Sequence, residues 1–365
     1  MPQTRRGFPR NPSGCTIHTM RSIPPKILVP VSAIFLLAVA LFVLNSFRSP
    51  GDGIGTERFV VSQEAARHEA VQDLRDQGFI RSTWAFNIVH PGSITPGGYR
   101  LSKDMGVLEV AGVLSSPPYM RWVTIPEGFR KEQTAELLAQ SLDWTENQKT
   151  DFITQDTEVD SDTAEGVYFP DTYLIPIEET TARVAKRLRN RFDEKFAPYA
   201  EEALEKNIRW PTLVKIASLI EREAAGKNDM ELVSGILWNR LLQNQKLQLD
   251  ATVQYARDTV SNYDIGSCEE DLCPGWQSRY HGTYAAEYGW WKPISVQDKN
   301  IRPFNTYVHP GLPERPISNP GLDAIRAALR PAQTDCLYYI HEDSGIIHCS
   351  ATYEGHLDNI ERHLK

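Results

Sequence analysis

The chain has 365 residues, of which 41% are hydrophobic and 24% charged, and its formal net charge is −8. This length exceeds one typical domain and the composition is that of a globular protein, so we expect two folded units. The acidic balance excludes nucleic acid as the expected partner of the folded part.

A basic tail, 1–26, precedes a predominantly apolar run from Ile27 to Phe47, and the first 50 residues contain no Asp or Glu. A run of this length can cross a membrane as a helix. Basic residues before it favour a cytoplasmic N-terminus, so the rest of the chain would be extracytoplasmic. The alternative is a cleaved signal peptide, but the run ends in Asn45-Ser46-Phe47, a poor cleavage site. We therefore expect a single-pass protein of the cell (inner) membrane.

After a linker, 48–56, hydrophobic periodicity predicts a small mixed α/β module over 57–154. Its expected strands lie near 58–61, 99–101 and 119–125, and its expected helices near 65–77, 107–114 and 131–140. This module has no obvious nucleophile or metal cluster, which suits binding or spacing. A polar, acidic stretch then opens a second unit, 155–365.

The second unit is predicted to begin with helices and to end with a hairpin and a last helix. The expected helices lie near 181–196, 211–225, 230–242 and 352–364. The hairpin lies between Cys336 and Cys349 and turns at 342–345, which brings these two cysteines close together.

Four cysteines follow the apolar run, and Cys268 and Cys273 form the second pair, around a short acidic loop. An even set in an exported chain suggests up to two disulfides, whose connectivity the sequence leaves open. A zinc site is the alternative, although a second ligand pair at standard spacing is missing. We expect no metal and no cofactor.

The segment 210–226 carries the most informative side chain. On a helical wheel, Glu223 falls inside the apolar stripe around Ile216, whereas Glu221 lies off the stripe. Because burying a charged carboxylate is costly, Glu223 is either paired for structural reasons or a carboxyl of raised pKa that acts as a general acid. Residues two apart cannot converge on one bond as a retaining glycosidase pair does, so Glu221 is expected to be a supporting neighbour.

Two polar, loop-rich segments follow, at 247–255 and 303–321. Their side chains either bind sugar hydroxyls or cap the turns in which they lie. The candidate substrate-binding residues are Gln248, Asp250, Thr252, Gln254, Asn305 and Tyr307. His309 and His348 look isolated, and we expect each to be a surface or packing residue.

An ordered set of motifs resembles the YceG-like (MltG) family of endolytic murein transglycosylases. The matching segments are Gly98-Tyr99-Arg100, 165–173, 217–224, Asn239-Arg240-Leu241, 247–255, Asn305-Thr306-Tyr307, Gly311-Leu312-Pro313 and 319–325. The chain departs from the family pattern at Ala251, where proline is usual, and over 261–301, which is longer than usual.

The resemblance implies an α+β fold with an N-terminal transmembrane helix, a LysM-like module and a helix-rich catalytic domain. It implies nonhydrolytic cleavage of the β-1,4 bond between N-acetylmuramic acid and N-acetylglucosamine in nascent peptidoglycan strands, which leaves 1,6-anhydro ends and terminates elongation. The family's catalytic glutamate matches Glu223. Peptidoglycan synthases, such as penicillin-binding proteins, would be partners. A noncatalytic wall-binding scaffold and a hydrolytic muramidase are the alternatives.

Overall fold

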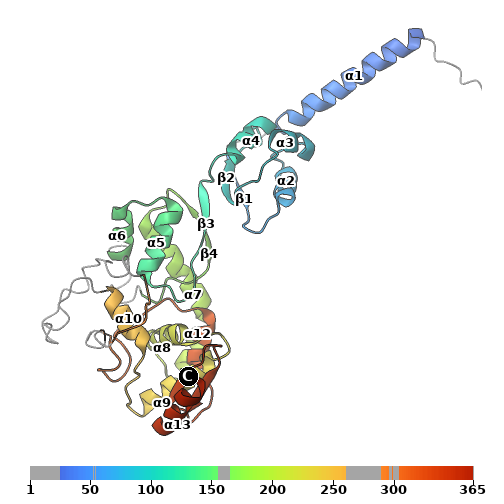
Figure 1. The fold of residues 1–365 in the computed structure, drawn as a ribbon. Coiled ribbons are helices and arrows are strands. Elements are labelled where there is room, and N and C mark those ends of the chain that lie inside the picture. Colours follow the sequence, from blue (N-terminus) through green and yellow to red (C-terminus); the bar gives the residue numbers. More distant parts are fainter. Residues whose placement is uncertain are drawn as a thin grey trace, which may run out of the picture. The chain divides into compact units, whose positions relative to one another are not determined.

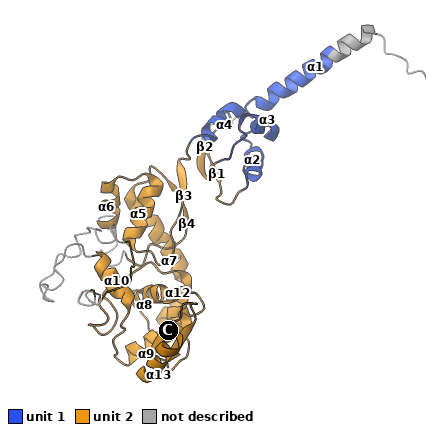
Figure 2. Cartoon of the chain, in the orientation of Figure 1, with its two compact units in different colours: residues 1–57, 66–94, 101–116 blue, residues 58–65, 95–100, 117–365 orange. Residues whose placement is uncertain are grey.

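The computed structural model describes residues 25–51, 53, 55–154, 165–259, 289–295, 298 and 304–364, with side chains from residue 33 onward. The chain divides into two compact units (Figure 2). The smaller unit comprises 1–57, 66–94 and 101–116, and the larger comprises 58–65, 95–100 and 117–365. All candidate site residues belong to the larger unit.

The smaller unit contains four described helices (Figure 1): α1 (Pro25–Phe47), α2 (Arg67–Asp76), α3 (Thr83–Val89) and α4 (Val107–Leu114). The rings of Phe42 and Phe47 on α1 lie 6.3 and 5.7 Å from the ring of Trp84 on α3. Arg81 donates to the side-chain oxygen of Asn45 at 3.0 Å. These contacts hold the end of α1 against α3 within this unit.

Within the described residues, no helix has both the length and the apolar character needed to cross a membrane. Residues 27–32 of the predicted span lie outside the described side chains, and the basic tail as far as residue 24 lies outside the described residues. The membrane span stays a prediction.

A sheet has the strand order β1-β2-β3-β4, and all of its residues except Glu57 and Leu101 belong to the larger unit. Its strands are β1 (Glu57–Val61), β2 (Gly97–Leu101), β3 (Met120–Thr124) and β4 (Thr172–Pro176). β3 and β4 pair antiparallel, with Trp122 opposite Leu174. At the start of β2, Gly97 has φ +152°, and a Cβ there would lie 2.6 Å from the carbonyl oxygen of Met120, so this close strand approach requires glycine.

Two hydrophobic clusters fill the larger unit. The first joins β3 and β4 to α5 (Lys131–Leu142), α6 (Glu146–Thr154) and α7 (Thr181–Glu205), and its members Phe152 and Leu188 are fully buried. The second surrounds α8 (Trp210–Glu223), which α9 (Met230–Leu242), α10 (Asp250–Thr259) and α12 (Leu322–Leu329) contact. Ile216, Leu219 and Ile220 of α8 are fully buried, so the predicted apolar stripe is confirmed.

The prediction of a loop over 247–255 was wrong, because α10 begins at Asp250. Ala251, Tyr255 and Ala256 are spaced four and five residues apart and lie together in the second cluster. Their burial stabilises this helix. The polar residues between them made the apolar face of the helix hard to recognise in the sequence. The hydroxyl of Thr252 donates to the carbonyl of Leu249 at 2.7 Å, which satisfies a polar group that would otherwise be buried unpaired.

The end of α8 also differs from the prediction, since the helix ends at Glu223 and not at residue 225. Ala224 already has extended backbone angles, φ −72° and ψ 138°. The carboxylate of Asp229 accepts hydrogen bonds from the N–H groups of Ala225 and Gly226, at 3.0 and 3.1 Å. These bonds replace helical ones, and they leave Glu223 as the last helical residue.

The predicted hairpin is confirmed: β5 (Tyr338–His341) pairs antiparallel with β6 (Ile347–Ser350). A disulfide joins Cys336 to Cys349, with 5.8 Å between their Cα atoms. The last helix, α13 (Tyr353–His363), packs against both strands. Cys268 and Cys273 lie outside the described residues.

Replacing both Cys336 and Cys349 by serine is expected to lower the free energy of unfolding by about 3 kcal/mol, because the disulfide closes a loop with a sequence separation of 13. Urea unfolding with and without a reductant measures the effect. Reductant should destabilise the wild type more than the double variant. Equal unfolding midpoints for the wild type and the double variant in the absence of reductant would contradict the prediction.

Candidate active site around Glu223

The carboxyl group of Glu223 lies where α8, α10 and β5 meet. The hydroxyl of Tyr339 on β5 donates to Glu223 Oε2 at 2.7 Å. The backbone N–H of Ala251, in the first turn of α10, also donates to this carboxylate. Glu223 lies on the apolar stripe of α8 and is the last residue of that helix. Because the helix ends there, the side chain of Glu223 can face both Tyr339 and Ala251.

Burial raises the pKa of Glu223 above its usual range, and the negative charge of Asp250 adds to the rise. The hydrogen bonds from Tyr339 and Ala251 act in the opposite direction, since they stabilise the ionised form. The carboxyl group is therefore protonated more readily than an exposed glutamate. When it is ionised, it accepts hydrogen bonds from Tyr339 and Ala251. This balance suits a carboxyl that gives up a proton and later takes one back.

Asp250 and Tyr307, both singled out from the sequence, lie beside Glu223. Tyr307 donates to Asp250 Oδ1 at 2.5 Å, and the side chain of Asp250 is exposed. Burial, together with this bond, raises the pKa of Tyr307 well above its usual value, so its hydroxyl stays a donor. The structure thus brings two predicted substrate-binding residues to the candidate catalytic carboxyl.

Thr252 and Asn305 are fully buried. Thr252 Oγ1 lies 3.1 Å from Thr306 Oγ1, and Asn305 Oδ1 accepts from the backbone N–H of Tyr307 at 2.9 Å. Their polar groups hold the loop of Tyr307 against α10, so in this structure they position a neighbour. A direct contact with substrate stays a prediction for both residues.

Gln248 is exposed and Gln254 is half-buried. Gln248 adopts a left-handed backbone with φ 55°, and its N–H donates to the carbonyl of Thr306 at 3.1 Å. This backbone bond places Gln248 at the turn into α10, next to Asp250. Sugar binding by either amide stays a prediction.

Sequence reasoning missed Tyr339 and gave Arg240 no role. Arg240 Nε donates to the carbonyl of Leu337 at 2.6 Å, and Nη1 donates to the carbonyl of Leu247. One guanidinium thus ties α9 to the start of the hairpin and to the segment before α10. The family-like triplet containing Arg240 was the only signal for this residue, and nothing in local spacing links Tyr339 to a helix 116 residues earlier.

Glu221 points to a different partner from Glu223. Its Oε2 accepts from the backbone N–H of Gly321, at the start of α12, at 3.0 Å. Burial raises the pKa of Glu221 to about 7, and the nearby carboxylates of Glu127 and Asp323 contribute to the rise. Glu221 therefore anchors α12 to α8.

Replacing Tyr339 by phenylalanine is expected to shift the alkaline limb of the kcat/KM profile to higher pH by about one unit, the worth of one hydrogen bond to a carboxylate. The sign follows from the bond: Tyr339 stabilises ionised Glu223, so its loss raises the pKa of Glu223, and the acid form persists to higher pH. Tyr338→Phe is the matched control, one position away on β5, and it should leave the limb in place. A shift of the limb to lower pH would contradict the assignment.

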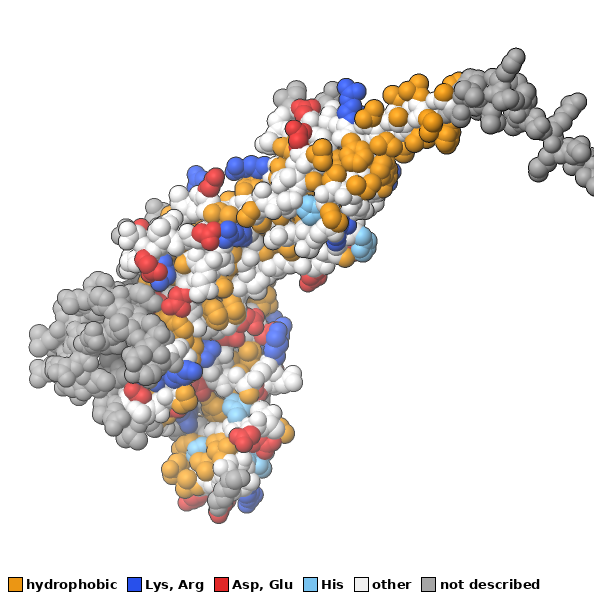
Figure 3. All heavy atoms as spheres, turned by 45° about the horizontal axis from the view of Figure 1, so that its top comes forward, with side chains coloured by type: hydrophobic (Ala, Val, Ile, Leu, Met, Phe, Trp, Pro, Cys, Tyr) orange, Lys and Arg blue, Asp and Glu red, His pale blue; other side chains and the backbone are white. Residues whose placement is uncertain are grey.

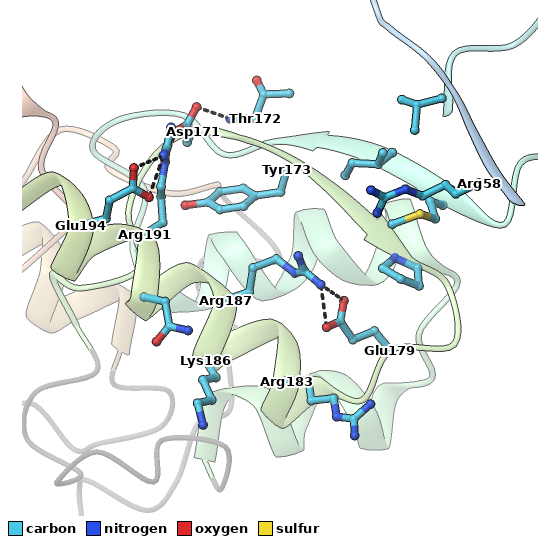
Figure 4. A pocket seen from close by; sticks show the side chains of 15 residues that line it. Arg58, Asp171, Thr172, Tyr173, Glu179, Arg183, Lys186, Arg187, Arg191 and Glu194 are labelled. Carbon is cyan, nitrogen blue, oxygen red and sulfur yellow. Dashed lines mark hydrogen bonds and ion pairs between the residues drawn. The ribbon is translucent and has the colours of Figure 1, made fainter. Parts of the chain in front are cut away.

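A separate groove of about 850 Å³ in the larger unit is lined by β1, β3, β4 and α7 (Figure 4). Arg187 reaches both oxygens of Glu179 at 2.8 and 2.7 Å, and Arg191 Nε donates to Asp171 at 2.7 Å. The lining includes neither Glu223 nor any predicted substrate-binding residue. The ion pairs hold the residues on either side of β4 to α7. Because no candidate site residue lines the groove, it is distinct from the candidate active site.

Comparison with known proteins agrees with the motifs and the fold. The family model described as the YceG-like family matches residues 59–362. Proteins named endolytic murein transglycosylase from Streptococcus pneumoniae strain D39 and Bacillus subtilis strain 168 are 25% identical over 301 residues and 26% identical over 290 residues. Each match covers 73% of this chain, which spans 50% of the length of the Streptococcus protein and 72% of the Bacillus protein.

Among solved structures, a YceG-like protein from Listeria monocytogenes has the same fold. Its TM-score is 0.54 at 21% identity, and the match covers 83% of this chain and 98% of that protein. Because the family model extends over most of the sequence, from β1 to the last helix, this chain belongs to the YceG-like family.

Proposed function

We propose that this chain is an endolytic peptidoglycan lytic transglycosylase that cuts the bond between N-acetylmuramic acid and N-acetylglucosamine and leaves 1,6-anhydro ends. The observation that carries the proposal is the carboxyl of Glu223, which has a raised pKa and accepts hydrogen bonds from two donors. The names of the Streptococcus and Bacillus relatives support the same reaction class. Cleavage of nascent strands would terminate their elongation.

In the proposed reaction, protonated Glu223 gives its proton to the glycosidic oxygen as the bond from C1 breaks. The C6 hydroxyl of the same muramic acid attacks C1, and its proton passes to the Glu223 carboxylate. Tyr339 and Ala251 stabilise that carboxylate between the two transfers. No water is consumed, and the intramolecular attack benefits from proximity.

A hydrolytic muramidase is the second candidate, because Asp250 brings another carboxylate close to Glu223. In a hydrolase, this second carboxylate would activate water or attack C1. The hydrogen bond from Tyr307 to Asp250 favours a binding role, since it occupies one of the two carboxylate oxygens.

Mass spectrometry of fragments released from purified peptidoglycan tests these functions. We expect anhydro-muramic ends, each lighter by one water than a reducing end. Reducing ends would identify a muramidase. Binding to the cell wall without cleavage by the folded protein would identify a noncatalytic scaffold. Either outcome would overturn the proposed reaction.

We infer further that Ile27–Phe47 anchors the chain in the cell membrane, with the tail 1–26 cytoplasmic and the linker 48–56, the LysM-like module 57–154 and the catalytic domain 155–365 extracytoplasmic. Hydrophobic side chains cover the described part of α1 (Figure 3), and Ile34 and Leu44 are each 68% exposed. The disulfide between Cys336 and Cys349 suits an oxidising compartment.

Protease protection in intact cells and in spheroplasts tests this topology. We expect the protease to digest the catalytic domain as soon as it reaches the outer side of the membrane, while the membrane is still intact. Protection of that domain until the membrane is lysed would contradict it. Co-purification from the membrane with peptidoglycan synthases, the penicillin-binding proteins, tests the proposed partnership.

A further inference from the structure

Three side chains with metal-binding atoms converge at the tip of the hairpin. Glu342 follows β5, His348 lies on β6, and His363 ends α13. His348 Nε2 and His363 Nδ1 lie 3.0 and 3.5 Å from the same oxygen, Glu342 Oε2. One ligand atom from each residue lies within 4.8 Å of the other two. The expectation that His348 is isolated was wrong, because α13 folds back onto the hairpin.

The spacing of these atoms matches that of ligands around one metal ion. Zn²⁺ binds imidazole nitrogen and carboxylate oxygen at about 2.0–2.1 Å, so neighbouring tetrahedral ligands lie about 3.3 Å apart. The two distances to Glu342 Oε2, 3.0 and 3.5 Å, lie on either side of that value. The three side chains are 24% to 30% exposed, so an ion could reach them from solvent.

We propose that Glu342, His348 and His363 bind one divalent transition-metal ion, with Zn²⁺ as the ion that best suits them. Two imidazoles and one carboxylate are a donor set that zinc accepts, whereas Mg²⁺ and Ca²⁺ prefer oxygen ligands alone. Three protein ligands leave a fourth position for water. The two imidazole rings stack nearly parallel, with centroids 3.5 Å apart, so the rings must turn for both nitrogen lone pairs to point at one ion.

The ion would act as a clamp between α13 and the hairpin. None of the residues of α13 is buried, so hydrophobic burial contributes little to holding this helix in place. The disulfide fixes the open end of the hairpin, and the ion would fix the opposite end. The strand between these two ties carries Tyr339, which contacts Glu223, and His341, which pairs with Asp229 at 2.6 Å.

Zinc binding by the full chain tests the site directly and does not depend on the proposed enzymatic function. After treatment with a chelator, the detergent-solubilised protein is titrated with Zn²⁺ by calorimetry, and bound metal is counted by elemental analysis. We expect one ion at this site and an increase in Tm on binding. Co²⁺ should give the visible absorption of a four-coordinate ion.

His348→Ala and His363→Ala are each expected to weaken binding at least about tenfold, since a lost ligand costs more than a lost neighbour of a ligand. The Co²⁺ absorption and the zinc-dependent rise in Tm should disappear with them. His68→Ala is the matched control, because His68 is an exposed histidine on α2 of the other unit. Glu342→Gln keeps the side-chain shape and removes the charge, and it serves if a histidine variant does not fold.

Two results would overturn the proposal. One is a folded wild-type chain that takes up no Zn²⁺ at micromolar concentrations. The other is uptake that His348→Ala, His363→Ala and Glu342→Gln leave unchanged. If Zn²⁺ uptake instead disappears in the double variant Cys268→Ser, Cys273→Ser, the metal binds at these cysteines, and the proposal is likewise overturned. Circular dichroism and the intact Cys336–Cys349 disulfide establish that each variant is folded.

Discussion

Replacing Glu223 by glutamine is expected to lower kcat for the release of anhydro-ended fragments by about 10²- to 10⁴-fold, the usual worth of a general acid or base. The loss should lie at the upper end, because one carboxyl performs both proton transfers in the proposed reaction. Glutamine keeps the shape and can still accept from Tyr339, so the fold and strand binding should persist. Fragment release under saturating substrate measures kcat, and co-sedimentation with cell wall measures binding.

Glu221→Gln is the matched control for that experiment. It makes the same chemical change two residues earlier on the same helix. The side chain of Glu221 accepts a hydrogen bond from Gly321 and does not contact the candidate active site. We expect less than tenfold loss of kcat. Equal losses for the two variants would show that the effect comes from disturbing α8, and full activity of Glu223→Gln would remove Glu223 from the mechanism.

Replacing Arg130 by methionine is expected to destabilise the fold by about 3–5 kcal/mol, because it leaves the buried carboxylate of Glu132 without its cation. Arg130 is 0% exposed, and its Nε donates to Glu132 at 2.6 Å. Its Nη atoms donate to the carbonyl of Tyr255 and the hydroxyl of Thr259, at 3.2 and 2.5 Å. The guanidinium thus joins the start of α5 to α10, the helix whose first turn contacts Glu223.

A double-mutant cycle separates the lost pair from lost packing. Arg130→Met combined with Glu132→Leu removes both charges, so it should cost less than the sum of the two single variants. Denaturant unfolding measures each free energy, and Arg183→Met, at an exposed position of α7, should change it by less than about 0.5 kcal/mol. A double variant whose cost equals the sum would contradict the buried ion pair as the cause.

The sequence determined the elements whose pattern is local. The period of apolar residues on α8 placed Glu223 on a buried stripe, and the turn at 342–345 predicted the hairpin that brings Cys336 close to Cys349. The bond between these two cysteines came from the structure. Helix ends were less secure, because the end of α8 depends on Asp229, which caps the N–H groups beyond it. The sequence did not predict α10, because packing in the core stabilises this helix and the intrinsic helix propensity of its residues does not.

Only the tertiary structure decided what surrounds Glu223. Tyr339 lies 116 residues further along the chain. Arg240 ties the start of the hairpin to α9 and to the segment before α10, and the disulfide joins the two ends of the hairpin, so Tyr339 is held at the carboxyl. The convergence of Glu342, His348 and His363 likewise requires α13 to fold back on the hairpin. Periodicity records which face of an element is buried, whereas contacts between distant elements depend on packing and buried hydrogen bonds. The sequence by itself therefore identified the carboxyl. The fold supplied the burial and the charge of Asp250 that raise its pKa, and the two donors that stabilise its ionised form.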